Sequence, residues 1–360
     1  MTSDRYTYAD WLHEEQERAS MREESEPGGH TNGQTGGRWH LLSDAELEEQ
    51  PPRQDVIQSI LPVAAFAPIV GPPASAKSTL AIDLACTLAT GLDWHGRPVL
   101  RGPVVFVAAE GSHGLGARLR AWKRAREWQG PAGVYFLPHA VNLMQPAEVD
   151  AFLKSINHTL SAAPALIVLD TLARCMCSGD ENSARDMGLW IAGADRLRTQ
   201  TGAGLVPIHH TTKAGTLERG SSALRGAADV LLLVEREDDV ITITCDKAKD
   251  STPFAPLRFA LNVIYVDPVV SACVLTLDTD RSHRRPVQLP ETRRRALEAL
   301  RDVDHGEGAT PAEWQRASGL VERTFHRAVK DLVAWELVSK TGSRRTVRYT
   351  TIRSPGETHV

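Results

Sequence analysis

The sequence predicts an α/β protein whose core is a mainly parallel β-sheet, followed by a small C-terminal domain. Two observations predict the core. Short apolar runs alternate with segments of helical periodicity over residues 56–280, and one strand-to-helix junction reads GPPASAKST, a phosphate-loop pattern. Continuous apolar strands are typical of a parallel sheet that helices cover on both faces. A helix–turn–basic helix pattern near residue 320 predicts the second domain.

The composition is that of a globular protein. Of the 360 residues, 42% are apolar and 24% are charged, which is ordinary for a folded chain. No apolar run reaches about 18 residues, which argues against a transmembrane helix and a membrane partner. No basic stretch followed by an apolar one, as in a secretory signal, opens the chain. The five cysteines are odd in number, so no disulfide framework is expected and the predicted compartment is cytoplasmic.

Charge divides the chain into three segments. Residues 1–55 hold 5 Lys/Arg against 13 Asp/Glu, residues 56–280 hold 20 against 22, and residues 281–360 hold 16 against 10. We therefore predict an acidic, largely flexible N-terminal segment, a neutral core, and a basic linker with a small domain. Residues 25–38 are Gly-rich and polar, too poor in apolar side chains to pack, whereas residues 8–20 allow a short helix. The N-terminal segment is then either a solvated tail or a docking segment for a partner or neighbouring subunit.

Strands and helices are expected to alternate within the core. The strands are short buried runs, and the helices carry apolar residues at helical spacing. Strict alternation after Asp229, with a turn at 237–239, predicts an antiparallel hairpin, and residues 260–277 allow another strand pair. Before the hairpin we expect strands over 60–70, 103–109, 165–170 and 204–209 and helices over 79–90, 116–128 and 184–199.

Residues 71–79 form the strongest local motif, close to the strand–loop–helix pattern that ends in Gly-Lys-Ser/Thr. Backbone N–H groups of such a loop bind phosphate. Lys77 is expected to neutralise β- and γ-phosphate charge, and Ser78 to offer its hydroxyl to Mg²⁺. Ala74 and Ala76 stand where glycine is common, and alanine is strained where φ is positive. A Pro-rich turn without a ligand is the alternative. The predicted nucleotide-binding residues are Gly71, Pro72, Pro73, Ala74, Ser75, Ala76, Lys77, Ser78 and Thr79.

Two carboxylates end apolar strands. Asp170 closes ALIVLD, and Glu110 follows PVVFVAA. At the carboxyl ends of parallel strands, Asp170 is expected to hold Mg²⁺ together with Ser78, and Glu110 to deprotonate the attacking water. Either acid alone is about as often a helix cap, but both together with the phosphate loop favour a nucleotide-hydrolysing site.

His209 and His210 end another buried strand, in IHHTTK. A polar cluster there can sense the γ-phosphate or couple it to a neighbouring loop, and a metal site is the alternative. No third and fourth ligand stands at suitable spacing, and Cys175-x-Cys177 lacks the second pair that a zinc site needs.

Cations follow in ERGSSALRG and DKAKD. A cation can stabilise charge on the transferring phosphoryl group from the same subunit or from a neighbour. Ordinary surface ion pairs with Glu218 and Asp250 are the alternative. The candidates for a phosphate contact across a subunit interface are Arg219, Arg225, Lys247 and Lys249.

Six segments stand in a fixed order over roughly residues 56–265: GPPASAKSTLAIDLA, VVFVAAEG, LIVLDTLARCMCSGDENSARDM, PIHHTTK, ERGSSALRGAADVLLLVER and DKAKD. Together they resemble the RepA-like AAA-family ATPases of the RecA-like hexameric helicase group. The resemblance implies a RecA-like P-loop NTPase core with ATP and Mg²⁺ as cofactors. It also implies a homo-oligomeric ring, a hexamer, with ATP sites between subunits and single-stranded DNA in its channel.

The resemblance also implies roles for individual residues and loops. The loops around 174–185 and 213–218 would face the channel. The two alanines of the phosphate loop depart from the family pattern and leave open a slow or binding-only ATPase. The implied catalytic residues are Lys77 and Ser78 on phosphate and Mg²⁺, Glu110 as base, Asp170 as second acid, His210 as γ-phosphate sensor and Arg219 as arginine finger.

The C-terminal segment contains a helix that Thr310 caps, a turn at 317–320, and a basic helix over 321–333. LVSKTGSRRTVRYTTI then has the pattern of two strands. This arrangement resembles a winged helix-turn-helix domain, which implies duplex DNA at the basic helix and the wing. A protein-binding winged helix is the alternative. The predicted DNA-binding residues are Arg323, Thr324, Arg327, Lys330, Arg344 and Arg345.

Two classes of function follow. The first is an ATP-driven ring motor on DNA, a replicative helicase of a plasmid, phage or other mobile element. The second is an ATP-gated DNA-binding initiator or regulator that assembles on DNA without unwinding it. A recombinase-like or signalling ATPase of the same fold is a third possibility.

Overall fold

The computed structural model describes residues 6–24, 42–50, 53–211, 219–250, 252–267, 270–278, 291–304, 308–335, 337–342 and 346–352. The helices are α1 (Tyr8–Glu24), α2 (Asp44–Glu48), α3 (Lys77–Thr90), α4 (Leu115–Ala125), α5 (Pro146–Thr159), α6 (Ala184–Thr201), α7 (Arg219–Ala227), α8 (Glu291–Val303), α9 (Pro311–Ser318) and α10 (Glu322–Ala334). The strands are β1 (Asp55–Ile57), β2 (Leu61–Pro62), β3 (Ile69–Gly71), β4 (Val104–Ala108), β5 (Val134–Leu137), β6 (Leu166–Asp170), β7 (Gly204–His210), β8 (Val230–Glu237), β9 (Val240–Ala248), β10 (Leu257–Tyr265), β11 (Ser271–Leu277), β12 (Val338–Thr341) and β13 (Arg348–Thr351).

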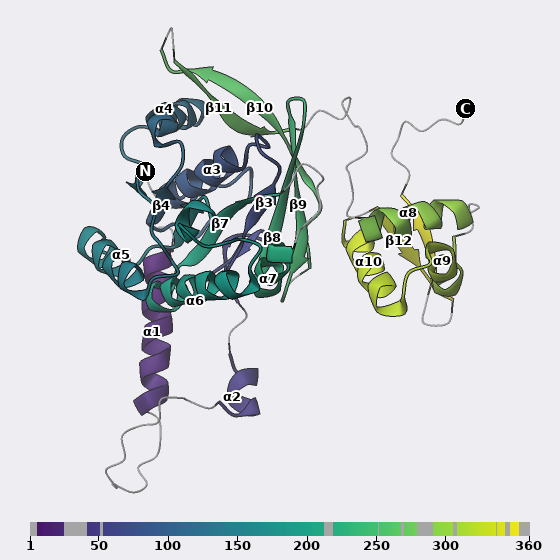
Figure 1. Ribbon diagram of the computed structural model, residues 1–360. Helices are drawn as coiled ribbons and strands as arrows, with labels where there is room; N and C mark the ends of the chain where they lie inside the picture. Colours follow the sequence, from purple (N-terminus) through teal and green to yellow (C-terminus); the bar gives the residue numbers. More distant parts are fainter. Residues whose placement is uncertain are drawn as a thin grey trace, which may run out of the picture.

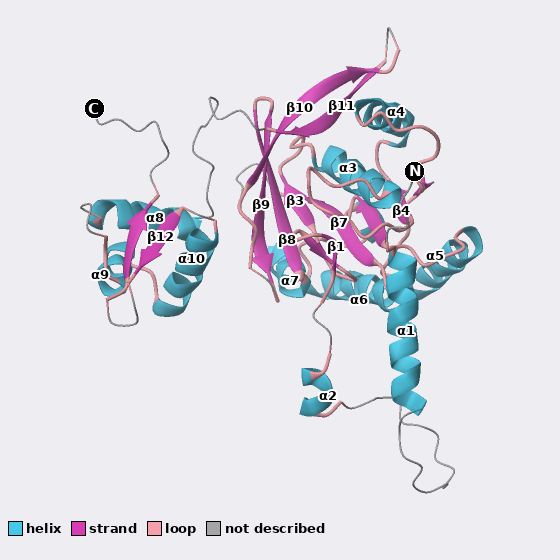
Figure 2. Ribbon diagram, turned by 180° about the vertical axis from the view of Figure 1, so that it is seen from behind, coloured by secondary structure: helices cyan, strands magenta, loops and turns pink. Residues whose placement is uncertain are grey.

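The core is a nine-stranded sheet in the order β11-β10-β9-β8-β3-β7-β6-β4-β5 (Figures 1 and 2). The strands from β8 through β3 to β5 run parallel, whereas β8 to β11 form an antiparallel meander. The α/β class with a mainly parallel sheet is therefore confirmed. The predicted hairpin is β8 and β9, and the second strand pair is β10 and β11.

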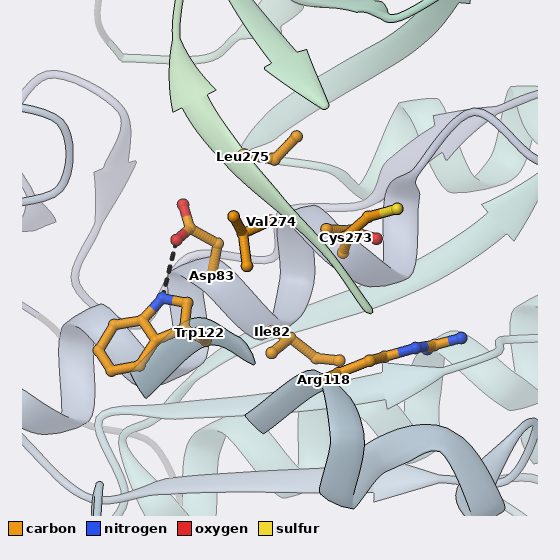
Figure 3. A pocket seen from close by; sticks show the side chains of 8 residues that line it. Ile82, Asp83, Arg118, Trp122, Cys273, Val274 and Leu275 are labelled. Atoms are coloured by element: carbon orange, nitrogen blue, oxygen red, sulfur yellow. Dashed lines mark hydrogen bonds between the residues drawn. The ribbon is translucent and has the colours of Figure 1, made fainter. Parts of the chain in front are cut away.

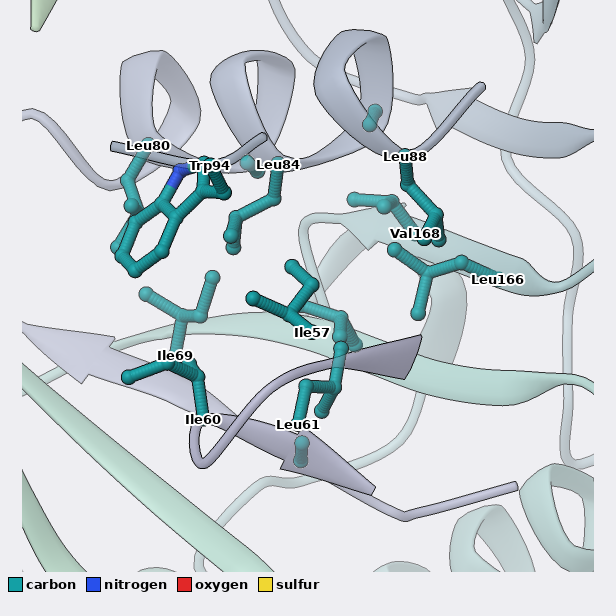
Figure 4. Packing of buried hydrophobic residues seen from close by; sticks show 14 of the residues in the cluster. Ile57, Ile60, Leu61, Ile69, Leu80, Leu84, Leu88, Trp94, Leu166 and Val168 are labelled. Carbon is teal, nitrogen blue, oxygen red and sulfur yellow. The ribbon is translucent and has the colours of Figure 1, made fainter. Parts of the chain in front are cut away.

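Both faces of the parallel part are covered, which explains why its strands are apolar throughout. Phe106 and Val168 point toward α3, α4 and the β1–β2 pair, while Val105 and Ile167 point toward α5 and α6. Figure 4 shows the first of these layers, where Leu80 and other α3 side chains meet the apolar side chains of the strands. This packing fixes the start of α3, and with it the loop that precedes the helix.

The expected strand over 60–70 is two short strands instead. Residues 63–68 lie between β2 and β3, and Pro62 and Pro68 interrupt the run because proline supplies no N–H for a ladder. Two further elements, β5 and α5, were not predicted from the sequence. The strand β5 is a sheet edge with only partly buried side chains, so it lacks the apolar run that identified the other strands.

The start of α1 is anchored in the core. Tyr8 is fully buried, its backbone N–H donates to Arg101 O at 2.6 Å, and its hydroxyl donates to Gly202 O at 2.7 Å. A Cβ on Gly102 would lie 2.8 Å from Tyr8 Cβ, so the pocket depends on glycine there. This contact ties part of the segment 1–55, expected to be largely flexible, to the core.

The C-terminal residues pack as a separate unit of α8, α9, α10 and the antiparallel pair β12–β13, with its own apolar cluster. Trp314 lies at its centre, 5.2 Å from the Phe325 ring and 5.1 Å from the Tyr349 ring. The predicted Thr310–Glu313 capping box is present. Within the described part of the chain, no helix is long and apolar enough to span a bilayer.

Candidate nucleotide-binding site

Four strand ends meet at one edge of the sheet. Gly71 at the end of β3 pairs with His210 at the end of β7, and Ala108 at the end of β4 pairs with Asp170 at the end of β6. Since β6 and β7 are also neighbours, the phosphate loop, His210, Asp170 and the Glu110 that follows β4 share the carboxyl edge. Ligands of open α/β sheets bind at this edge.

Two alanines of the phosphate loop adopt the left-handed backbone conformation, which strains residues other than glycine. Ala74 has φ 62° and Ala76 has φ 68°, a region that costs an L-residue roughly 1–2 kcal/mol. A Cβ on Gly71 would lie 2.1 Å from Val234 O, so glycine is required there. Ala76 is the N-cap of α3 and offers no side-chain acceptor, which leaves the first N–H groups of the helix available to an anion.

Lys77 folds back over the loop. Its Nζ donates to Gly71 O at 2.8 Å and to Pro72 O at 2.6 Å, and the residue is 3% exposed. Burial lowers the pKa of Lys77 to about 8, against the opposing charge of Asp170. The ammonium is thus held by carbonyl dipoles at the place where phosphate oxygens would be stronger partners.

Asp170 and Ser78 lie together beneath the loop. Ser78 lies close enough to Asp170 to affect the pKa of its carboxyl group. Burial raises the pKa of Asp170 to about 6, and the Ser78 hydroxyl and the charge of Arg118 limit that rise. One carboxylate with one hydroxyl is a donor set that fits Mg²⁺, which completes its shell with water and phosphate oxygens.

Glu110 stands where a water-activating base is expected, and it faces solvent. Its side chain is 52% exposed, its backbone N–H donates to Asp170 O at 3.2 Å, and Gly111 turns the chain away with φ 68°. The nearest described cation is Arg174, whose Nε lies 4.0 Å from Glu110 Oε2. Such an exposed pair is weak, so a stronger anionic partner of Arg174 can break it.

The two histidines differ. His209 Nδ1 lies 3.1 Å from Glu181 Oε2, which ties β7 to the loop after β6. Burial and the charge of Lys77 lower the pKa of His210, so its imidazole is neutral at pH 7 and lies near the phosphate loop. Among the described residues, no group of three or more His, Cys, Asp or Glu side chains has the arrangement of a metal site.

The cations proposed for a subunit interface lie elsewhere. Lys247 pairs with Leu231 near the start of β8, while Val70 pairs with Leu233 further along the same strand, so Lys247 lies toward the amino end of β3. Lys249 follows β9 and is exposed. Arg225 on α7 pairs with Asp246. Arg219 begins α7, but its side chain lies outside the described residues.

Two residues near the site, Arg118 and Asp83, were not predicted from the sequence. Arg118 on α4 is close enough for its charge to lower the pKa of Asp170, and with Thr79 and β11 it lines a crevice of about 10 Å³ (Figure 3). Its sequence signal is weak: a basic residue on the helix that follows Glu110.

Asp83, on α3, is buried and fixes α4 against α3. It accepts hydrogen bonds from Trp94 Nε1, Trp122 Nε1 and His95 Nε2, each at 2.9 Å, and from Arg126 at 3.2 Å. Burial raises the pKa of Asp83, but these partners outweigh it and hold the pKa below its ordinary value. Four donors on a buried carboxylate compensate its desolvation, so this network sets the position of Arg118.

The predicted DNA-binding residues of the tail lie mostly on one side of α10. Arg323, Arg327 and Lys330 are exposed and Thr324 is partly buried. Arg344 and Arg345 fall between β12 and β13, outside the described residues.

Comparison with known proteins identifies the core. Residues 37–216, half of the chain, match the family model described as AAA domain. The crystal structure of the RadB recombinase is a further similar structure, at 13% identity and a TM-score of 0.41, and the match covers 56% of this chain and 88% of that one. The chain belongs to the AAA domain family of P-loop ATPases.

Proposed function

We propose that this protein is an ATP-hydrolysing DNA motor of the RepA-like type, a replicative helicase of a plasmid, phage or other mobile element. In this proposal the subunits form a hexameric ring with ATP sites between them. The convergence of Lys77, Asp170, Glu110 and His210 on one sheet edge carries the proposal. AAA domain membership supports the ATPase part of it.

Each residue has a step in the proposed reaction. Lys77 leaves the carbonyls of Gly71 and Pro72 and binds the β- and γ-phosphates. Ser78 and Asp170 hold Mg²⁺, which neutralises phosphate charge when bound. Glu110 accepts the proton of the attacking water. His210, neutral at pH 7, offers a ring nitrogen to the γ-phosphate.

Arg174 offers a route from DNA to hydrolysis. It lies in the loop that the resemblance to RepA-like ATPases places at the channel, and its side chain is 63% exposed beside Glu110. A DNA phosphate that captures Arg174 releases Glu110 for the attacking water. This step gives single-stranded DNA a direct way to stimulate hydrolysis.

Duplex DNA would bind the C-terminal unit. Its helix–turn–helix and strand pair support a winged helix, and the exposed Arg323, Arg327 and Lys330 supply phosphate contacts. The excess of 16 cations over 10 acids in residues 281–360 agrees with a nucleic-acid partner.

The alternative is an ATP-gated DNA-binding initiator or regulator that assembles without unwinding. The positive φ angles of Ala74 and Ala76 favour it, because strain in the phosphate loop slows a cycle that must form and release this shape repeatedly. Strand separation of a forked duplex with ATP distinguishes the two. A motor separates the strands of the fork with ATP, and its Glu110→Gln variant does not. An ATP-gated DNA-binding protein binds the fork without separating its strands.

A further inference from the structure

Arg327, Asp331 and Trp335 form one stripe along α10 and its cap, and the stripe faces the core. Trp335 Nε1 donates to Pro253 O at 2.8 Å. Burial raises the pKa of Cys245 on β9, and the nearby Asp331 carboxylate adds to that rise. Residues at i, i+4 and i+8 share a helix face, so this face of α10 lies against the end of β9 and the segment after it.

Five cations gather where the stripe meets the core, and we call them the junction cluster: Arg225, Lys247, Lys249, Arg293 and Arg327. Burial lowers the pKa of Arg225, and the charges of Arg293 and Arg327 lower it further. Lys247 and Lys249 lie close enough to interact as well. The cluster joins α7 and β9 of the core to α8 and α10 of the tail.

Carboxylates compensate only part of this charge. Asp246 pairs with Arg225, and Asp331 pairs with Arg293 at 2.6 Å. Lys247 Nζ donates to the carbonyls of Arg225 and Gly226 at 2.8 and 2.9 Å, which closes the end of α7.

Neither Arg327 nor Lys249 has a side-chain hydrogen bond or ion pair with the part of the chain that the structure describes. Like charges that nearby carboxylates match only in part disfavour the docked arrangement unless an anion joins them. Guanidinium groups bind phosphate through two parallel hydrogen bonds.

We propose that the junction cluster binds a phosphate group between Arg225 of the core and Arg327 of the tail. The phosphate comes either from a DNA backbone or from a nucleotide held by a neighbouring subunit. The site goes beyond the proposed function, because it makes one phosphate ligand join both parts of a subunit. It rests on that function only for these two sources.

The first experiment uses inorganic tripolyphosphate, so that it depends on neither DNA binding nor hydrolysis. Calorimetric titration of full-length Lys77→Ala protein, in which the phosphate loop is disabled, should show one saturable site. Adding Arg327→Gln should weaken it at least about tenfold, the loss expected for one charged hydrogen-bonded partner. Arg316→Gln, which changes an exposed arginine on α9, is the matched control and should change affinity less than about twofold. Equal binding by the Arg327→Gln and Arg316→Gln proteins overturns the proposal.

Two double-mutant cycles then identify the source. For DNA, the affinity for duplex DNA is measured without nucleotide at several salt concentrations. Arg225→Gln and Arg327→Gln should each reduce the slope of log affinity against log salt concentration by about 1. The double variant should bind DNA within about threefold of the weaker-binding single variant. If the phosphate comes from a neighbour's nucleotide, the Arg225→Gln and Arg327→Gln losses should be non-additive in ATP turnover measured without DNA instead. As a control, the Arg225→Gln/Arg323→Gln double variant should show the product of its two single-variant losses in either assay. Coupling in neither cycle contradicts a shared phosphate, whereas absence of ATP turnover with intact tripolyphosphate binding refutes only the proposed function.

Trp335→Phe tests the docking itself. It keeps the ring in the tail cluster and removes the N–H that reaches Pro253. Tripolyphosphate affinity should fall in the same direction as in Arg327→Gln, by about threefold or more. Unchanged affinity with an unchanged melting temperature would show that the site does not depend on the docked arrangement.

Discussion

The carboxyl edge of the sheet and the junction cluster both gather charge, but they are built differently. At the carboxyl edge, Lys77 donates to the carbonyls of its own loop, Ser78 and Asp170 lie close together, and all three lie on packed elements of one subunit. At the junction, Arg327 and Lys249 are exposed and make no ion pair with the described residues. The difference indicates that the first region is arranged by contacts inside the core, whereas the second gathers cations that its own carboxylates match only in part.

Lys77→Ala should break the first region most completely. The change removes the one buried cation of the phosphate loop, and no measurable ATP turnover should remain. Lys123→Ala, which removes a half-buried lysine of α4 that donates to Gly130 O, is the control and should hydrolyse ATP normally. Full turnover by the Lys77→Ala protein would mean that the nucleotide binds elsewhere.

Arg219→Ala tests whether the start of α7, the helix that carries Arg225 of the junction cluster, acts on a neighbouring subunit. Turnover should fall by about 10³-fold or more, as for an arginine finger. Mixing this variant with Lys77→Ala subunits should restore part of the activity, because some interfaces then pair an intact loop with an intact arginine. If mixed oligomers assemble normally and stay inactive, the role across the interface is wrong.

Glu110→Gln should separate binding from chemistry. Hydrolysis should fall by about 10²- to 10⁴-fold, while ATP affinity stays within about twofold because Glu110 is exposed and makes no contact with Lys77. Equilibrium binding of a fluorescent ATP analogue and steady-state turnover measure the two. A parallel loss of affinity would instead give Glu110 a role in the phosphate loop.

Asp170→Asn should stabilise the protein while removing Mg²⁺-dependent turnover. Burial raises the pKa of Asp170 from 3.8 to about 6, so its ionised form is less favourable in the folded state. The free energy of unfolding of the wild-type protein therefore falls as pH rises from about 4 to 6, because Asp170 ionises. At pH 8 the Asp170→Asn variant should be more stable than the wild type by about 2 kcal/mol. At pH 4 the difference should vanish. Equal stabilisation at both values would exclude ionisation as the cause.

Ala76→Gly should give the smallest effect. Glycine relieves the left-handed strain but raises the conformational entropy of the unfolded chain. The net effect should be a gain of about 0.5 kcal/mol in the free energy of unfolding, and ATP affinity should rise slightly. Ala117→Gly, within the helix α4, is the matched change and should destabilise by about 1 kcal/mol. Opposite signs in urea melts of the two variants support strain in the phosphate loop, and equal destabilisation argues against it.

Local patterns made the carboxyl edge predictable. The strands ending at Ala108 and Asp170 are continuous apolar runs because both sheet faces are covered, and the phosphate loop has a fixed spacing. The capping box at Thr310 is equally local. The placement of Lys77, Glu110, Asp170 and His210 follows from strand ends alone, although their roles stay predictions.

Long-range contacts escaped prediction. The donors to Asp83 come from residues up to 43 positions away, and the burial of Tyr8 depends on Gly202, 194 positions later. The edge strand β5 lacks the apolar run of its neighbours. Trp335 gave no signal of its contact with Pro253 because nothing in either local sequence encodes the other.

Steady-state ATP hydrolysis with and without single-stranded DNA tests the central claim most directly, with Glu110→Gln as control. The proposed motor predicts DNA-stimulated turnover that the control loses while still binding ATP. Tight ATP binding with no turnover in the wild-type protein, with or without DNA, would contradict it.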